Sequence, residues 1–162
     1  MKNIYLFDWG DTLMVDFKGQ QGKMCHWNKV QATDGAKDVL AELSKNHLIY
    51  VATNAADSTE SDIKKAFERV ELAQYIDGYF CKTNLGVGKG TPEFFSRIIK
   101  SLKVSPHMIT MVGDSYNNDI APAISAGIHA IWISSQNDHS HLNDEAQQID
   151  KLRDILVKRE AR

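Results

Sequence analysis

The sequence alternates short, almost wholly apolar runs with longer segments in which apolar residues recur every three or four positions. Runs of this kind are typical of strands buried on both faces, and the longer spacing predicts amphipathic helices between them. The predicted strands are residues 4–7, 48–52, 79–81, 109–112 and 130–133, and the predicted helices are 35–44, 58–69, 92–102, 118–126 and 144–158. This alternation predicts a doubly wound, three-layer, Rossmann-like α/β fold with a parallel sheet.

Length and composition narrow the class of protein further. The chain has 162 residues, the length of one ordinary domain, so we expect residues 1–162 to form a single unit. A net charge of −2, with Lys and Arg scattered along the helical segments, gives no sign of a nucleic-acid partner. No apolar stretch is long enough to span a membrane and no secretory signal is recognised, so a cytoplasmic location is expected.

Chemically active side chains follow the predicted strands. Asp8 comes directly after the first strand, Thr53 and Asn54 after the second, and Asp114 two residues after strand 109–112. Lys89 lies in the loop that leads into helix 92–102. In doubly wound folds, ligands bind outside the carboxyl ends of the strands, so we expect these side chains on one rim. Each alone is explained as a turn former, a helix cap or a solvated lysine, but their joint occurrence points to a site.

Four segments resemble, in order, the signatures of the haloacid dehalogenase-like hydrolase superfamily, and the resemblance covers nearly the whole chain. The segments are FDWGDTL at 7–13, VATNA at 51–55, GKGTPEFF at 88–95 and MVGDSYNNDI at 111–120. The resemblance implies that Asp8 is a nucleophile and that Thr53 and Lys89 bind phosphate. It also implies a Mg²⁺ site formed by acidic residues of the fourth segment with Asp8.

The chemistry of these residue types agrees with what the resemblance implies. A carboxylate such as Asp8 can attack phosphorus and form an aspartyl-phosphate intermediate. Because its charge repels a phosphate dianion, Mg²⁺ held by Asp8 and Asp114 is expected to neutralise the pair. Lys89 supplies a second positive charge, and the Thr53 hydroxyl with the backbone N–H of Asn54 is expected to hold the non-reacting oxygens.

Two further positions complete the predicted metal site, Gly10 and Asp119. Asp119 follows Asp114 in the pattern G-D-x-x-x-x-D. It either ligates the metal through water, orients Lys89, or is simply a carboxylate in the first turn of a helix, where the helix dipole favours it.

Gly10 stands where phosphatases of the superfamily carry a second Asp, which protonates the leaving oxygen and later activates water. General acid–base help of this kind contributes roughly two to four orders of magnitude in rate. Asp11 is the candidate replacement, because Gly10 permits backbone angles that other residues avoid. Three readings stay open: a phosphatase that uses Asp11, a water or the substrate as acid; a chemistry that never needs the second Asp; and an interaction module that binds phosphate or metal without turnover.

The sequence leaves no room for a separate cap domain between the predicted elements. Residues 14–32 are predicted to form a flap loop beside the nucleophile, in which Trp27 either contacts substrate or packs the flap down. Members of the superfamily that lack a cap act on bulky phosphorylated substrates or use a neighbouring subunit as a wall, so the resemblance implies a bulky substrate or a homo-oligomer.

Overall fold

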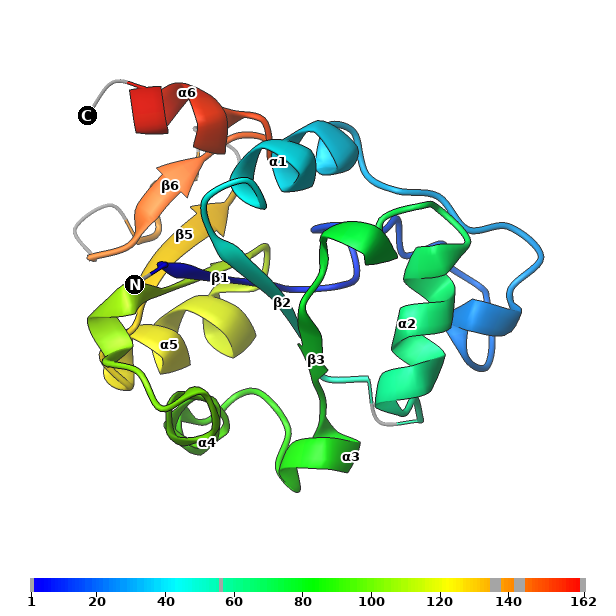
Figure 1. The fold of residues 1–162 in the computed structure, drawn as a ribbon, viewed down its shortest axis with the longest axis horizontal. Coiled ribbons are helices and arrows are strands. Elements are labelled where there is room, and N and C mark those ends of the chain that lie inside the picture. Colours follow the sequence, from blue (N-terminus) through cyan, green and yellow to red (C-terminus); the bar gives the residue numbers. More distant parts are fainter. Residues whose placement is uncertain (1, 56, 135–137, 142–144, 161–162) are drawn as a thin grey trace.

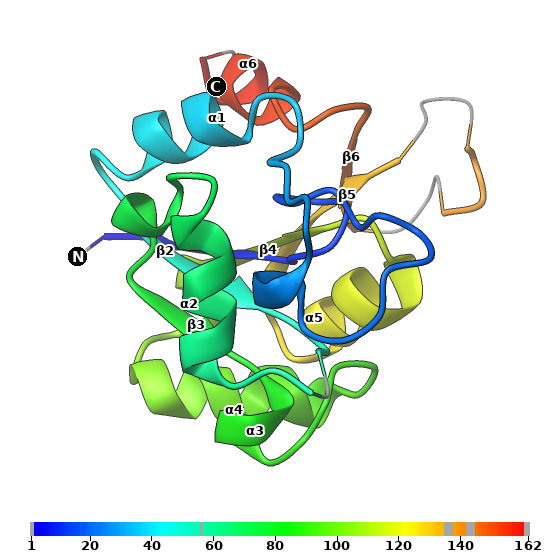
Figure 2. The same cartoon turned by 90° about the vertical axis from the view of Figure 1, so that its right-hand side faces the viewer.

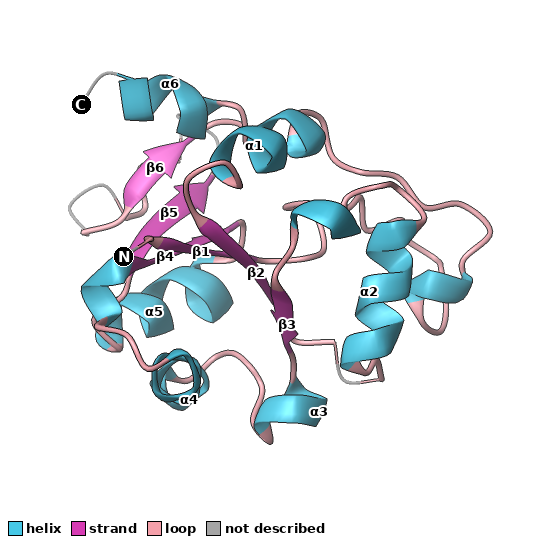
Figure 3. Ribbon diagram, viewed as in Figure 1, coloured by secondary structure: helices cyan, strands magenta, loops and turns pink. Residues whose placement is uncertain are grey.

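A six-stranded parallel sheet forms the centre of the molecule, with the strand order β3-β2-β1-β4-β5-β6 (Figures 1 and 3). The computed structural model describes residues 2–55, 57–134, 138–141 and 145–160. The strands are β1 Ile4–Phe7, β2 Leu48–Ala52, β3 Gly78–Phe80, β4 Ile109–Gly113, β5 His129–Ile133 and β6 Gln147–Ile149. The helices are α1 Ala36–Leu43, α2 Glu60–Glu68, α3 Lys82–Leu85, α4 Pro92–Leu102, α5 Ala121–Ser125 and α6 Asp154–Glu160. The predicted doubly wound α/β fold is confirmed.

Helices cover both faces of the sheet, which gives the three layers. In β1, Phe7 packs in the core cluster that contains residues of α1, α2 and α6, whereas Ile4 and Leu6 pack with α4 and α5. Figure 1 shows α1 and α6 above the sheet and α4 and α5 below it. Both faces of β1 are therefore buried, as its continuous apolar sequence requires.

The strand order reverses at β1, which pairs with β2 on one side and β4 on the other. Phe7 is in register with Val51 of β2 and with Val112 of β4. The point of reversal leaves a crevice beyond the carboxyl ends of β1 and β4, the usual ligand position in such sheets. Asp8, directly after β1, therefore lies at this crevice.

The last segment of the chain differs from the prediction of a helix over 144–158. Residue 144 lies outside the described residues, Gln147–Ile149 form β6 beside β5, and α6 begins only at Asp154. Ile149, Leu152 and Ile155 are all buried, so a strand followed by a turn mimics helical spacing. The Asp154 carboxylate accepts the backbone N–H groups of residues 150 and 151, which holds the turn between β6 and α6.

No inserted helical domain is found among the described residues between β1 and α1 or between β2 and β3. The first connection contains one short helical turn, Met24–His26, and the second contains α2 and the turn Ala73–Tyr75. Across the described part of the chain, none of the helices is both long and apolar enough to cross a membrane.

Candidate active site

Three carboxylates from two strand ends and one turn meet at the carboxyl edge of the sheet. Asp8 follows β1, Asp114 follows β4, and Asp119 belongs to a single π-helical turn, Tyr116–Ile120. One oxygen of each carboxylate lies within 4.8 Å of the others. Together with Lys89 they form what we call the acid–lysine cluster.

The Lys89 ammonium lies at the centre of this cluster. Its Nζ donates to Asp8 Oδ1 at 2.6 Å, to Asp119 Oδ1 at 2.7 Å and to the backbone oxygen of Ala52 at 3.0 Å. Its side chain is only 3% exposed. Burial lowers the pKa of this ammonium, but the negative charges of Asp8 and Asp119 outweigh that effect and raise the pKa above its usual value. Lys89 is therefore a fully charged cation that uses all three of its donors.

Asp119 is buried in the cluster and is not an exposed carboxylate at a helix start. Its side chain is 1% exposed, Oδ1 accepts from Lys89, and Oδ2 accepts from the backbone N–H of Ser115 at 3.2 Å. A Cβ atom at position 113 would overlap this carboxylate, so the glycine at the end of β4 is required for the approach. Of the roles open for Asp119, the geometry favours orienting Lys89.

The cluster holds more negative than positive charge. Burial, followed by hydrogen bonding and repulsion from Asp8, raises the pKa of Asp114 to about 7. Burial likewise raises the pKa of Asp119 to about 6, helped by the charge of Asp8 and opposed by Lys89. A divalent cation at this place would offset the surplus negative charge.

The donor set fits Mg²⁺. The three side chains offer only carboxylate oxygens, which are the ligands that this hard cation prefers. Gly10, also predicted in the metal site, has no side chain and can offer only its backbone carbonyl. The cluster thus satisfies the chemical requirement for a magnesium site, with Asp8, Asp114 and Asp119 as candidate ligands.

Thr53 and Asn54 follow β2 on the same rim. Thr53 is buried, and its hydroxyl oxygen accepts from the backbone N–H of Ala55 at 3.1 Å, which leaves the O–H free to donate. The Asn54 side chain accepts from the backbone N–H of Lys89 at 2.9 Å. Asn54 therefore fixes the loop that carries Lys89, a role that sequence reasoning missed because it considered only the backbone of Asn54.

Asp11 does not join the acid–lysine cluster. It is exposed, has a left-handed backbone with φ of 59°, and its Oδ1 accepts from the backbone N–H of Asp16 at 3.0 Å. Its neighbour Thr12 is buried and donates from its hydroxyl to Asp8 Oδ2 at 3.3 Å. In the structure the Asp11 carboxylate holds the backbone of the flap at Asp16. Its role as substitute acid stays a prediction.

The flap, residues 14–32, lies against α2, as Figures 1 and 2 show. The Arg69 guanidinium, directly after α2, donates to the backbone oxygens of Trp27 at 2.6 Å and of Cys25 at 3.2 Å. Lys23 forms an ion pair of 2.9 Å with Asp62. The Trp27 ring packs against the core cluster that contains α1 and α2. Of the two readings for Trp27, the structure supports the one in which it packs the flap down.

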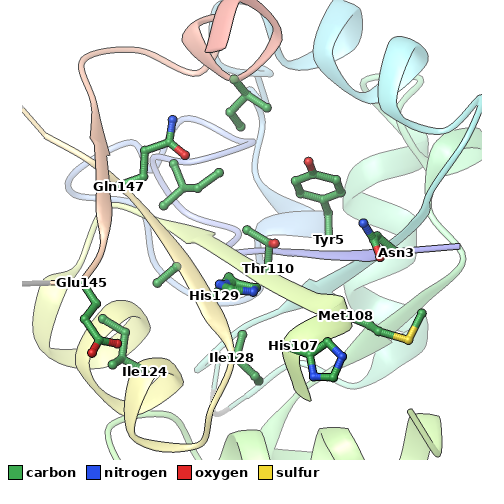
Figure 4. Close-up of a pocket in the computed structure, with 13 residues that line it drawn as sticks. Asn3, Tyr5, His107, Met108, Thr110, Ile124, Ile128, His129, Glu145 and Gln147 are labelled. Atoms are coloured by element: carbon green, nitrogen blue, oxygen red, sulfur yellow. The ribbon is translucent and has the colours of Figure 1, made fainter. Parts of the chain in front are cut away.

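A separate hollow of about 400 Å³ lies at the opposite end of the sheet (Figure 4). Its lining includes Asn3 before β1, His107 before β4, and His129 at the start of β5. It contains none of the residues of the acid–lysine cluster. The chemistry suggested by the sequence therefore belongs to the carboxyl edge of the sheet and not to this hollow.

A parallel sheet with acidic side chains beyond its two central strands defines an α/β protein of the type that binds ligands at a topological switch point. A family model described as haloacid dehalogenase-like hydrolase matches residues 16–127. The chain belongs to this hydrolase family.

A curated relative agrees with this assignment, and solved structures share the fold. The glyceraldehyde 3-phosphate phosphatase of Pyrococcus furiosus is 28% identical over 98 residues, which are 60% of this chain and 40% of that protein. The chain spans less than half the length of the curated relatives it matches. An uncharacterised protein from Listeria monocytogenes has the same fold, with a TM-score of 0.83 at 22% identity, covering 98% of this chain and 97% of that one. The putative hydrolase YfnB of Bacillus subtilis, solved bound to magnesium, aligns with a TM-score of 0.75 at 15% identity, covering 97% and 98%.

Proposed function

We propose that the protein is a magnesium-dependent phosphohydrolase that cleaves phosphate monoesters through an aspartyl-phosphate on Asp8. The observation that carries the proposal is the convergence of Asp8, two further carboxylates and the buried Lys89 ammonium at the switch point of the sheet. The name of the Pyrococcus relative, a phosphatase of a sugar phosphate, supports a phosphorylated substrate.

Hydrolysis takes two displacements at phosphorus. A carboxylate oxygen of Asp8 forms a bond to phosphorus while the bond to the leaving alcohol oxygen breaks. Water then attacks the aspartyl-phosphate, releases inorganic phosphate and restores the Asp8 carboxylate. Thr12, which donates to Asp8 Oδ2, and Lys89, which donates to Oδ1, orient the nucleophile.

We assign phosphate binding to the residues that directly follow β2 and to Lys89. The Thr53 hydroxyl, the Asn54 backbone N–H and the Lys89 ammonium are the donors proposed for the non-reacting oxygens. Donors fixed in place before the reaction are typically worth about 3–4 kcal/mol each in the transition state. Asn54 adds to this fixation because its side chain holds the Lys89 backbone.

Mg²⁺, when bound, supplies positive charge next to the phosphoryl oxygens and allows two anions to approach each other. Asp8 and Asp114 are the proposed direct ligands, with the Gly10 carbonyl and Asp119 as the other predicted members of the site. The oxygen-only donor set and the raised pKa values of Asp114 and Asp119 support this assignment.

The described residues hold no cap over the rim, so we propose substrates whose bulk extends beyond the site. A second candidate function is a module that binds phosphate or metal without turnover. The specific observation in its favour is Gly10, which leaves position 10 without the carboxyl group of an acid catalyst.

Hydrolysis of p-nitrophenyl phosphate, with Mg²⁺ and with a chelator, separates the two functions. If the protein is a phosphohydrolase, the wild type hydrolyses this ester. The Asp8→Asn variant is then expected to reduce kcat by roughly three orders of magnitude or more, as expected when a nucleophile is removed. Asp34→Asn is the matched control, because the Asp34 side chain is 90% exposed. A wild type that is inert across a broad panel of phosphate esters, yet binds Mg²⁺ and inorganic phosphate, would establish the binding module instead.

A further inference from the structure

The space beside Gly10 is filled by a carboxylate from elsewhere in the sequence. A Cβ atom built at Gly10 would lie 3.5 Å from both the Cβ and the Oδ2 of Asp16. This distance is ordinary van der Waals contact, and Gly10 is not among the glycines with positive φ. The Asp16 carboxylate therefore lies where a short side chain at position 10 would project.

A tight loop brings Asp16 to this place. Asp11 reverses the chain with φ of 59°, and its backbone N–H donates to the oxygen of Met14 at 2.6 Å. The Asp11 carboxylate then accepts the backbone N–H of Asp16 at 3.0 Å. Met14, buried and bridged to both Gly10 and Ala32, anchors the loop to the base of the flap. The fold thus uses Asp11 to set the position of Asp16.

Position 10 lies in a loop that folds back on the nucleophile. The chain bends at Trp9, directly after Asp8, and the Thr12 hydroxyl, two residues beyond Gly10, donates to Asp8 Oδ2 at 3.3 Å. Trp9 is 5% exposed and packs on Phe67 of α2, inside the core. With Trp9 anchored in the core and Thr12 bonded to Asp8, the loop that carries Gly10, and with it the Asp16 carboxylate beside Gly10, is held next to the nucleophile.

The Asp16 carboxylate is also free to act. It is exposed, and among the described residues no group hydrogen-bonds to its carboxylate oxygens. Asp8 and Asp119 on this rim are engaged with Lys89, Asp11 is engaged with the Asp16 backbone, and Asp114 belongs to the proposed metal site. Among the described acids of the rim, Asp16 combines a position beside residue 10 with carboxylate oxygens that accept no hydrogen bond.

We propose that Asp16 is the general acid and base of this site, an inference that rests on the proposed phosphohydrolase function. In the first step Asp8 bonds to phosphorus, the ester P–O bond breaks, and the proton of the Asp16 carboxyl goes to the leaving alcohol oxygen. In the second step the Asp16 carboxylate takes a proton from water as that water bonds to phosphorus and the bond to Asp8 breaks. Inorganic phosphate leaves, and both acids return to their starting states. Asp11 is then a positioning residue.

The test compares two substrates in Asp16→Asn, because only a poor leaving group needs a proton. For an alkyl phosphate such as glycerol 2-phosphate, kcat/KM is expected to fall by roughly 10²–10⁴-fold. For p-nitrophenyl phosphate, whose leaving group departs as a stable anion, kcat/KM is expected to fall less than about tenfold. Asp34→Asn, at a side chain that is 90% exposed, is expected to leave both values unchanged, and Mg²⁺ affinity is expected to stay at the wild-type value in Asp16→Asn.

Rescue distinguishes a chemical role from a structural one. In an Asp16→Ala background, Gly10→Asp places a carboxyl group at nearly the same point and is expected to restore at least a tenth of the lost kcat/KM for the alkyl phosphate. Asp11→Asn is expected to give a smaller loss than Asp16→Asn, since it loosens the loop without removing the acid.

The outcomes distinguish a failure of the role of Asp16 from a failure of the proposed phosphohydrolase function. If the wild type turns over and Asp8→Asn abolishes turnover while Asp16→Asn leaves the alkyl phosphate unaffected, the function stands and the role of Asp16 is overturned. A larger loss in Asp11→Asn than in Asp16→Asn overturns it in favour of Asp11. A wild type with no turnover of either substrate overturns the proposed function and this inference together.

Discussion

The acid–lysine cluster and the flap lie on the same rim, but different forces hold them. In the cluster, a Lys89 side chain that is 3% exposed joins carboxylates from two distant segments at 2.6 and 2.7 Å. In the flap, exposed Arg69 donates to backbone oxygens, and Lys23 pairs with Asp62 at the surface. Buried charges bind strongly only while every partner is present, whereas surface contacts contribute little each.

This difference indicates that the acid–lysine cluster and the flap have different roles. The side built from strand ends has fixed positions, as electrostatic stabilisation of a transition state requires. The flap side is joined to α2 by bonds that can be removed one at a time. We therefore expect changes in the cluster to alter stability and metal binding, and changes in the flap to alter the leaving-group side alone.

The largest expected effect comes from removing the cation of the cluster. Lys89→Met leaves the Asp8 and Asp119 carboxylates buried without their partner, and we expect a loss of about 3–5 kcal/mol in the free energy of unfolding. Urea denaturation in the presence of a chelator measures it. Lys100→Met, an exposed lysine of α4, is the matched control. A loss no larger than that of the control would break the contrast between the two regions.

Magnesium is expected to stabilise the cluster side. At a concentration about 100 times its Kd, a ligand adds about 2.7 kcal/mol to the stability of the folded state. For a chain of this length that corresponds to a rise of roughly 5–10 °C in Tm. Asp114→Asn should remove most of the rise, and the flap variant Arg69→Ala should keep it. Equal rises in all three proteins would mean that the ion binds elsewhere.

The pH dependence of stability sharpens the comparison further. Burial and the neighbouring Asp8 raise the pKa of Asp114 to about 7 from the ordinary value of 3.8. In this window the folded state holds more protons than the unfolded state, so the metal-free protein should lose stability as pH rises from about 4 to about 7. Asp114→Asn should make the decline shallower, and Arg69→Ala should not. Urea midpoints with a chelator, measured across this range, would contradict the prediction if the Asp114→Asn decline matched the wild type.

The smallest effect is expected in the flap. Arg69→Ala removes the bonds from the guanidinium to the oxygens of Cys25 and Trp27, and because these bonds are exposed we expect a loss of only about 1 kcal/mol. Amide hydrogen exchange in the flap should accelerate while exchange in β1 and β4 stays unchanged. Lys64→Ala, an exposed position on α2, serves as control. Faster exchange in β1 would show that the flap and the cluster are not independent.

Much of the fold was predictable because its strands are buried on both faces. The runs at β1, β2, β4 and β5 stand out as apolar segments, and their bounds agree with prediction to within a residue. The strand β6 was missed because Gln147 and Gln148 carry no apolar pattern, and its short edge position needs none. The predicted final helix was wrong in its first half for a different reason. Buried side chains in the strand and the turn that follows it recur at a spacing that resembles one face of a helix.

In the site, sequence order shows which residues end strands but not how loops fold back. The meeting of Asp8 with Asp114 was predictable, because parallel strands deliver their ends to one edge. The approach of Asp16 to Gly10 was not, because it depends on the left-handed backbone of Asp11 and on one side-chain bond to the main chain. Such contacts depend on loop conformation, for which hydrophobic periodicity carries no signal.

The full set of bonds at Lys89 has a consequence for the order of events. Its three N–H donors already reach Asp8, Asp119 and the oxygen of Ala52. If the proposed function holds, a phosphoryl group can receive one of these donors only when an existing acceptor gives it up. If that acceptor is Asp8 Oδ1, substrate binding would free an oxygen of the proposed nucleophile, so that recognition and activation would be a single exchange of partners.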